Sequence, residues 1–297
     1  MKPLSGRIAC LPAPAVPPPR LALLTLLLAN AVCAGAAASA DGFRLQDLLP
    51  NPLQKSPRID LSVITEITPA GKKLPAAKPS RPVYYFGVDG GLDQGGPVLA
   101  DQPAPDRTYF RKLMAQALAK TGYLPADAAH PASLFVVFKW GTINQVAGDM
   151  DQDGNASASR DRFQTELVLQ RAQIVGGDAF AEKLARAEME GPIALDRLHT
   201  SEPRLYEQAM SDLYYVAAFA LDMKAASNGQ RTLLWWTRMC TSSSGLSMDE
   251  TLPVLLTAGE NYFGQAMQGA QIVTVRMNEG KVSVGAVEVK GYLPAAK

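Results

Sequence analysis

The chain has 297 residues, of which 47% are hydrophobic, and this length is ample for a large hydrophobic core. Its 29 Lys and Arg nearly balance 28 Asp and Glu, and no basic block occurs, which argues against a nucleic-acid partner. Of the three cysteines only Cys240 lies beyond the first 33 residues, so the rest of the chain cannot form an internal disulfide.

The first forty residues are organised like a secretory signal. Three basic residues precede an uncharged run over residues 21–40, which ends in Ala38-Ser39-Ala40. Small residues at these positions suit signal peptidase, so we expect cleavage after Ala40. The sequence therefore predicts a signal peptide over residues 1–40 and an exported protein, either periplasmic or secreted.

Three alternatives stay open for this segment. Cleavage after Ala34 is a second choice, because Val32-Cys33-Ala34 also ends in a small residue. Residues 21–40 are just long enough to cross a hydrocarbon core of about 30 Å as an uncleaved anchor. A lipidated Cys33 is the third alternative, although the residues before it differ from those expected of a lipoprotein. We expect membrane contact only through such an uncleaved or lipidated N-terminus.

Residues 41–82 form a proline-rich segment. Its seven prolines prevent long helices and predict an extended arm. Within it Ile59, Leu61 and Val63 alternate with polar residues, which predicts a half-buried strand, expected at an edge of the sheet. A globular domain is expected over residues 83–297.

In the first part of this domain the sequence predicts a strand, a loop, a helix and a second strand. Val83–Val88 indicates a buried strand, followed by a loop rich in glycine and proline. Asp106 is placed to cap a helix that ends before Gly122. Leu134–Trp140, apolar at six of seven positions, predicts a central strand, and residues 141–162 predict a polar surface excursion.

Helical periodicity returns over residues 163–175. Gly176-Gly177 is expected to break this helix, and Asp178 to cap the next one. A further helix is expected from Pro203 to about Asp212, because proline is favoured in a first turn.

Two hairpins and one more helix complete the expected elements. Residues 213–226 and 232–240 flank Asn228-Gly229, a strong hairpin signal, although the first run could also continue the preceding helix. Ser247 and Glu250 have the spacing of a reciprocal capping box, which predicts a helix over residues 248–268. Residues 272–289 predict a second hairpin. The fold class expected is α+β, a single domain with a mostly antiparallel sheet covered by helices.

One segment has the spacing of a metal site. Asp149, Asp151 and Asp153, with Gly154, match positions 1, 3, 5 and 6 of a calcium-binding loop. Arg160 stands at position 12, where a bidentate glutamate belongs. The three aspartates are therefore candidate ligands for a weak Ca²⁺ site, with a solvated acidic loop as the alternative. No other cofactor is expected.

The remaining reactive side chains do not form a catalytic signature. A lone Cys240 on an apolar strand is typical of a small buried hydrophobe, and His130 and His199 are both expected in loops. The glycine-rich residues 87–96 lack the lysine of a phosphate-binding loop, and serines 242–244 lack the nucleophile-elbow pattern.

Two aromatic pairs could line a groove for sugars or peptides: Trp235-Trp236 and Tyr84-Tyr85. Adjacent residues of a strand point to opposite faces, so one of each pair at most can belong to a single groove. Core packing on both faces is the alternative interpretation.

Several short segments resemble a family of uncharacterised exported bacterial proteins. They are Thr65-Glu66-Ile67-Thr68, Pro82-Val83-Tyr84-Tyr85, Ala117-Leu118 with Gly122-Tyr123, Phe138-Lys139-Trp140-Gly141, Leu234-Trp235-Trp236-Thr237-Arg238 and Tyr262-Phe263-Gly264. The resemblance implies export and a single domain, and it implies no activity.

These observations favour a non-catalytic envelope protein, a binding or structural module for an envelope protein or small ligand. The alternative is a hydrolase of cell-envelope material that uses scattered carboxylates. In that case Glu66, Asp89 and Asp93 should converge in one cleft.

Overall fold

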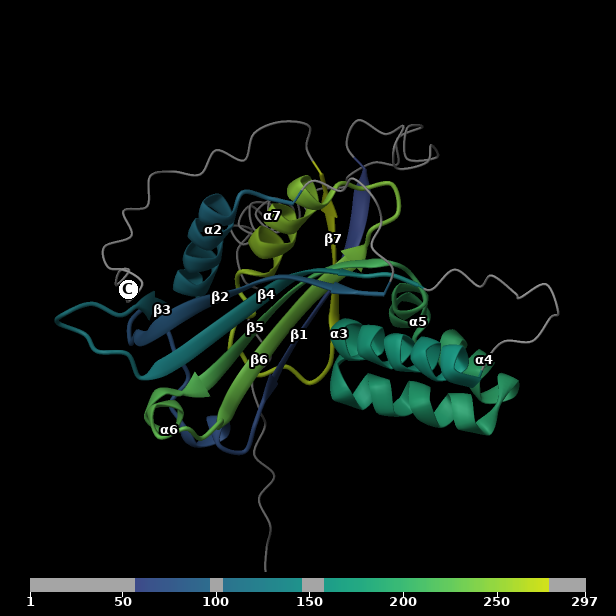
Figure 1. Ribbon diagram of the computed structural model, residues 1–297, viewed down its shortest axis with the longest axis horizontal. Coiled ribbons are helices and arrows are strands. Elements are labelled where there is room, and N and C mark those ends of the chain that lie inside the picture. Colours follow the sequence, from purple (N-terminus) through teal and green to yellow (C-terminus); the bar gives the residue numbers. More distant parts are fainter. Residues whose placement is uncertain (1–56, 97–103, 146–157, 278–297) are drawn as a thin grey trace, which may run out of the picture. The chain divides into compact units, whose positions relative to one another are not determined.

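The computed structural model describes residues 57–96, 104–145 and 158–277, which form a single α+β domain (Figure 1). In these residues no helix is long and apolar enough to cross a membrane. The elements in chain order are β1 (Arg58–Ile67), the 3-10 turn η3 (Gly71–Lys73), β2 (Val83–Gly95), α2 (Arg107–Lys120), β3 (Tyr123–Pro125), β4 (Leu134–Ile143), α3 (Ala158–Glu190), α4 (Pro192–Ser201), α5 (Pro203–Ala209), β5 (Leu213–Asp222), α6 (Met223–Ser227), β6 (Leu233–Ser242), α7 (Met248–Gly259) and β7 (Gln271–Arg276).

The seven strands form one sheet in the order β3-β2-β4-β5-β6-β1-β7. Strand β2 runs parallel to both β3 and β4. The pairs β4 with β5, β5 with β6, β6 with β1, and β1 with β7 are all antiparallel. The predicted fold class, an α+β domain with a mostly antiparallel sheet and helices against it, is confirmed.

Helices pack against both faces of this sheet, so the domain has two hydrophobic cores. Helices α2 and α7 lie against one face, where Trp140, Tyr214 and Met239 are buried (Figure 1). Helices α3, α4 and α5 lie on the other side, where they pack on Tyr215 and Cys240. Because side chains alternate along each strand, neighbouring residues of the central strands enter different cores.

Strand β1 lies inside the sheet, so the prediction of an edge strand is wrong. Its residues pair with β6 on one side and with β7 on the other, and both Leu61 and Val63 are completely buried. The pattern near residue 60 indicates a strand correctly. It cannot reveal that β7 also pairs with this strand, because β7 lies far along the chain and begins at Gln271.

Strand β2 is longer and less buried than predicted. It continues through the glycine-rich segment to Gly95, with an irregularity between Asp89 and Leu92, and only Tyr85 is fully buried. Strand β2 extends this far because the neighbouring strand β4 also continues, to Ile143. Residues 141–143 therefore belong to the sheet and not to a surface excursion.

The helical and hairpin signals have mixed outcomes. Gly177 has a positive φ of 81° and interrupts α3, as predicted. Strands β5 and β6 form the predicted hairpin, but the short helix α6 occupies part of the connection. Helix α7 ends at Gly259 rather than near residue 268, since Phe263 enters the core and Gly264 adopts a left-handed φ of 61°. Strand β7 matches the start of the last predicted hairpin, and its second strand lies outside the described residues.

Of the N-terminal caps predicted at Asp106 and Ser247, only the first forms. The Asp106 carboxylate accepts a hydrogen bond of 2.7 Å from the Tyr109 backbone N–H at the start of α2. The Ser247 side chain makes no capping hydrogen bond and donates instead to the Glu250 carboxylate at 3.1 Å. The capping box predicted for α7 is therefore wrong, because its two side chains bond to each other and not to the backbone.

This difference predicts that two matched substitutions lower the free energy of unfolding by unequal amounts. Asp106→Ala should lower the free energy of unfolding by about 1 kcal/mol, because it leaves a helix-terminal N–H without its acceptor. Ser247→Ala should cost less than about 0.5 kcal/mol, since no cap is lost. Urea unfolding followed by circular dichroism measures both values, and equal costs would contradict the assignment of the caps.

Candidate functional site

The three predicted calcium ligands, Asp149, Asp151 and Asp153, lie outside the described residues. Within the residues that the structure describes, no group of three or more His, Cys, Asp or Glu side chains is arranged to hold a metal ion.

Cys240 is the small buried residue that the sequence predicts. It is completely buried on β6, its Sγ lies 3.0 Å from the Ser62 hydroxyl, and burial raises the pKa of its thiol to about 12. His130 lies in a loop beside Asp127, at 3.0 Å. His199 lies in the last turn of α4 and not in a loop as predicted, because the helix that begins at Pro192 extends past it.

The carboxylates of the alternative hydrolase prediction do not share a cleft. Asp89 lies 3.1 Å from Arg107 and 3.2 Å from Arg111, while Asp93 lies 3.2 Å from Lys139. Glu66 is on β1, four strand spacings from Asp93 on β2, which corresponds to about 19 Å. Each carboxylate is thus paired with its own cation at a separate place.

Arg238 is the partner of Glu66 and is almost fully buried, with 2% of its side chain exposed. Its guanidinium also lies 3.7 Å from the Asp178 carboxylate and 3.6 Å from the centre of the Trp236 ring. Burial lowers the pKa of Arg238 to about 9. A buried cation with these partners holds α3 against β1 and β6, which is a structural role.

Trp235 and Trp236 point to opposite faces of the sheet, as strand geometry requires. Trp236 packs on Phe219 on the side of α3, with a ring separation of 5.7 Å. Trp235 is 4% exposed and packs on Tyr123 on the side of α2 and α7. The other aromatic pair divides in the same way, since Tyr85 is buried and Tyr84 stacks on His130 at 4.4 Å.

Trp235 forms one wall of an apolar pocket of about 410 Å³, which we call the Trp235 pocket. It opens where β1 ends and β6 begins. Its lining comprises Ile67, Gly71, Lys72, Leu74, Pro75, Ala76, Val83, Tyr123, Ser133, Leu134, Asp222, Leu234, Trp235, Gly264 and Ala266. A concave and mainly apolar cavity with a few polar groups is the usual form of a small-molecule site.

Residues 262–266 close the base of this pocket. The Thr65 hydroxyl donates to the Tyr262 carbonyl at 2.7 Å, and the Gly264 N–H donates to the Thr237 hydroxyl at 3.2 Å. A Cβ on Gly264 would lie 2.0 Å from the Tyr123 hydroxyl oxygen, so only glycine fits. Burial raises the pKa of Tyr123 to about 12.

The mouth of the pocket is formed by the rim loop, residues 68–82. Thr68 fastens this loop to β6, because its backbone N–H donates to the Leu234 carbonyl at 2.9 Å and its hydroxyl donates to the Leu233 carbonyl at 2.7 Å. A Cβ on Gly71 would lie 2.0 Å from the Leu234 carbonyl oxygen, so glycine permits this close approach. Leu74 remains 47% exposed at the mouth.

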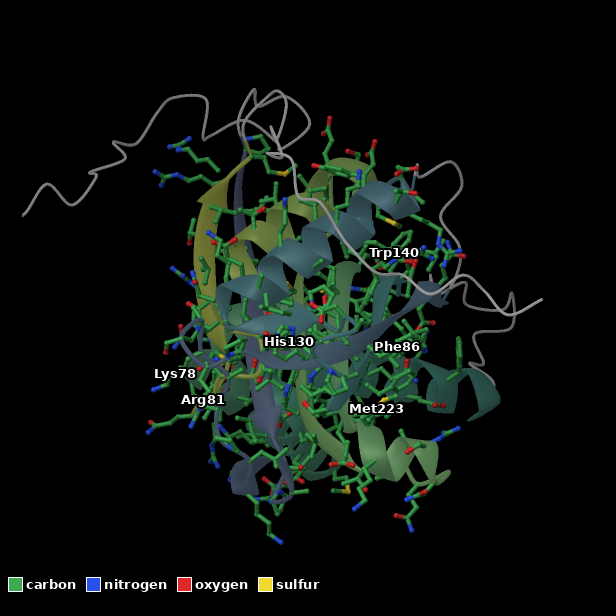
Figure 2. The ribbon with its side chains drawn as sticks, turned by 90° about the vertical axis from the view of Figure 1, so that its left-hand side faces the viewer. Lys78, Arg81, Phe86, His130, Trp140 and Met223 are labelled. Atoms are coloured by element: carbon green, nitrogen blue, oxygen red, sulfur yellow. The ribbon has the colours of Figure 1, made fainter. Side chains whose placement is uncertain are left out.

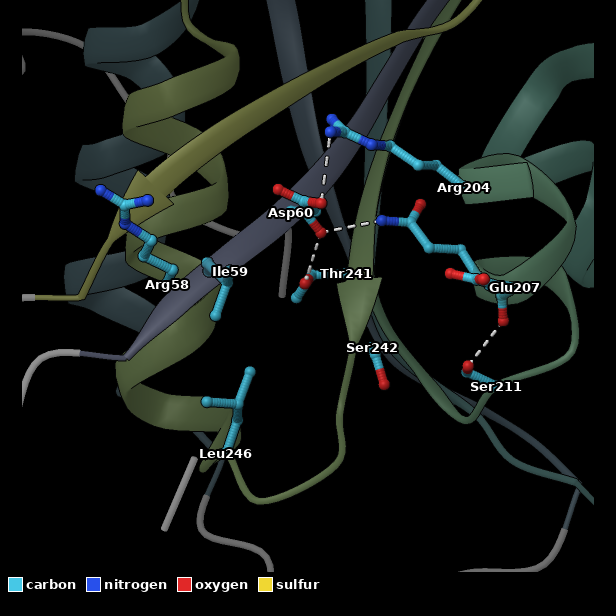
Figure 3. Close-up of a pocket in the computed structure, with 10 residues that line it drawn as sticks. Arg58, Ile59, Asp60, Arg204, Glu207, Ser211, Thr241, Ser242 and Leu246 are labelled. Atoms are coloured by element: carbon cyan, nitrogen blue, oxygen red, sulfur yellow. Dashed lines mark hydrogen bonds and ion pairs between the residues drawn. The ribbon is translucent and has the colours of Figure 1, made fainter. Parts of the chain in front are cut away.

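A second, smaller pocket of about 210 Å³ lies between β1, α5 and the end of β6 (Figure 3). The Asp60 carbonyl accepts hydrogen bonds from the Gln208 side-chain amide at 2.8 Å and from the Thr241 hydroxyl at 2.9 Å. Arg204 lies 4.0 Å from the Asp60 carboxylate. These contacts join α5 to the sheet, which is a structural role, and the larger, mainly apolar Trp235 pocket is the better candidate site.

Of the pocket residues, sequence reasoning singles out Trp235 alone as a candidate ligand contact. It misses Lys72, Leu74 and Gly264. A signal for Lys72 is nevertheless present, because no acidic residue occurs between Glu66 and Asp89 while four basic residues do. Gly264 carries no such signal, since its contact with Tyr123 joins residues far apart in the chain.

No family model and no curated protein matches the chain. Among solved structures, a dodecamer of a PelC variant from Paraburkholderia phytofirmans is similar at 11% identity, with a TM-score of 0.26, over 68% of this chain and 95% of that chain. A PDZ domain protein from Parabacteroides distasonis is similar at 11% identity, with a TM-score of 0.33, over 75% of this chain and 40% of that one. At these scores neither likeness bears on function.

The Asp89 cluster predicts a specific dependence of stability on pH. Burial alone would raise the pKa of Asp89, but the Gly91 N–H, Arg107 and Arg111 bring it below its usual value. A carboxylate with a lowered folded-state pKa stabilises the fold fully above its unfolded pKa, about 3.9, and loses this effect as the pH falls through the folded pKa.

Asp89→Asn should therefore lower the free energy of unfolding at pH 7 by about 1–2 kcal/mol. The difference from the unaltered protein should shrink when urea unfolding is repeated at pH 3 and below. Asp196→Asn, at an exposed aspartate of α4, is the matched control and should change little at either pH. A pH-independent difference for Asp89→Asn would contradict the role assigned to its charge.

Proposed function

We propose that the protein is an exported, non-catalytic binding module that takes up the apolar part of a small ligand in the Trp235 pocket. The observation that carries this proposal is the pocket itself, with its volume of about 410 Å³ and its mainly apolar lining. That volume falls in the lower part of the range of roughly 300–1,000 Å³ for small-molecule sites.

The construction of the pocket supports binding over a purely structural role. Its base and mouth are held by hydrogen bonds through Thr65, Thr237 and Thr68, so the cavity is formed before any ligand enters. A preformed cavity reduces the ordering cost of binding. The alternative, a hydrolase, gains no site from Glu66, Asp89 and Asp93, because each of them is paired with a different arginine or lysine at a separate place.

Binding to the Trp235 pocket can be measured with the neutral fluorescent probe N-phenyl-1-naphthylamine. We expect saturable binding of one probe per chain, with the increase in emission that an apolar environment gives. Val83→Trp and Ala266→Trp place large rings in the pocket from two different elements, and each should weaken binding at least tenfold. Ala179→Trp, at an exposed residue of α3, is the matched control and should bind normally.

Two results would overturn this assignment. One is unsaturable binding, and the other is equal binding by all three variants. Circular dichroism of each variant establishes that it is folded, and the use of two pocket variants guards against the loss of either one through misfolding.

Export is the second part of the proposal and is supported by the basic and then uncharged pattern of residues 1–40. Expression in a Gram-negative host, followed by fractionation and intact-mass measurement, tests it. We expect a periplasmic or secreted chain that begins at Asp41. A cytoplasmic chain of full mass would contradict export. A membrane-bound chain that is uncleaved or lipidated at Cys33 would show instead that the protein is tethered to the membrane.

A further inference from the structure

The rim loop gives the mouth of the Trp235 pocket a strong positive charge. Lys72, Lys73, Lys78 and Arg81 are all exposed within this loop, which contains no acidic residue. Figure 2 shows Lys78 and Arg81 beside each other at one side of the domain, in agreement with the bridge between their backbones. An anion that approaches this mouth is therefore attracted by several cations at once.

Lys72 connects this charge to the cavity, because it belongs to the rim loop and also lines the pocket. Within the described residues, neither Lys72 nor Lys73 forms an ion pair, unlike Lys139 and Lys183 elsewhere on the surface. The acidic residue in the lining, Asp222, keeps its negative charge, and a hydrogen bond of 2.7 Å from the Ala225 N–H holds its carboxylate at the start of α6. The rim loop and the lining together are thus positive, because Lys72, Lys73, Lys78 and Arg81 outnumber the single carboxylate of Asp222.

The interior of the pocket has the opposite character. Ile67, Val83 and Leu134 form part of its wall, and the exposed Leu74 extends the apolar surface to the mouth. A ligand that satisfies both regions has an apolar chain and an anionic end. The volume of about 410 Å³, near the lower limit for small-molecule sites, favours one chain over a two-chain lipid.

We propose that the ligand of the Trp235 pocket is a single-chain amphiphile with a carboxylate or phosphate head group, its chain in the cavity and its head at Lys72. This inference rests on the proposed function, because it assigns a ligand class to the same pocket.

The test is displacement of N-phenyl-1-naphthylamine by four ten-carbon compounds: decanoate, decyl phosphate, decanol and decylammonium. Because all four have ten carbons, their alkyl chains differ by one carbon at most, and a tenfold difference in affinity reports the head group. At low salt at least one of the two anions should bind ten times more tightly than decanol, and decylammonium should bind weakest. This preference should decline as salt is added, since ions screen exposed charges.

Charge reversal at the rim identifies the residues responsible. Lys72→Glu with Lys73→Glu should weaken binding of the anion at least tenfold more than it weakens binding of the neutral probe. Lys112→Glu, at an exposed lysine of α2, is the matched control and should alter neither value. A preference for decyl phosphate over decanoate would identify the head as a phosphate, and the reverse as a carboxylate.

The outcomes separate this inference from the function on which it rests. Equal binding of decanol and both anions would overturn the anionic head group while leaving the pocket a binding site. Failure of the neutral probe itself to bind would overturn the proposed function. Binding to phosphatidylglycerol vesicles without binding of any monomeric compound would also overturn the inference, because the rim would then contact a membrane surface.

Discussion

The alternation of side chains along β6 determines what lies on each face of the sheet. Trp235, Thr237 and Met239 point toward α2 and α7, whereas Trp236, Arg238 and Cys240 point toward α3. A shift of one residue in the pairing of β6 would exchange the two sets and place the guanidinium in the wrong core. The buried ion pair with Glu66 and the wall of the pocket therefore depend on the same register.

Features with a local cause could be predicted from the sequence. The Asp106 cap, the break at Gly177 and the hairpin near Asn228 each depend on a few neighbouring residues, and the structure contains all three. The position of β1 and the length of β2 depend on partners distant in the chain. Patterns of hydrophobicity indicate that a residue is buried, but they do not say which strand covers it.

The candidate site was harder to predict for the same reason. Trp235 belongs to a recognisable aromatic pair, and strand geometry predicts that only one member enters a given groove. The rest of the pocket combines the rim loop, the starts of β2 and β4, and the segment around Gly264. No spacing in the sequence indicates this combination, because the lining residues outside the rim loop come singly or in pairs from segments far apart in the chain.

The position of β1 between β6 and β7 has a consequence for how this domain acquires its structure. The strand is the first described element of the chain, yet its partners, β6 and β7, are among the last. Closing loops of this length is slow and comes late in folding. Leu61 and Val63 therefore stay without their neighbours until nearly the whole chain has left the ribosome. Until β6 and β7 emerge, the unpaired β1 leaves apolar side chains and backbone groups open to pairing with other chains, so aggregation is the main hazard of this stage.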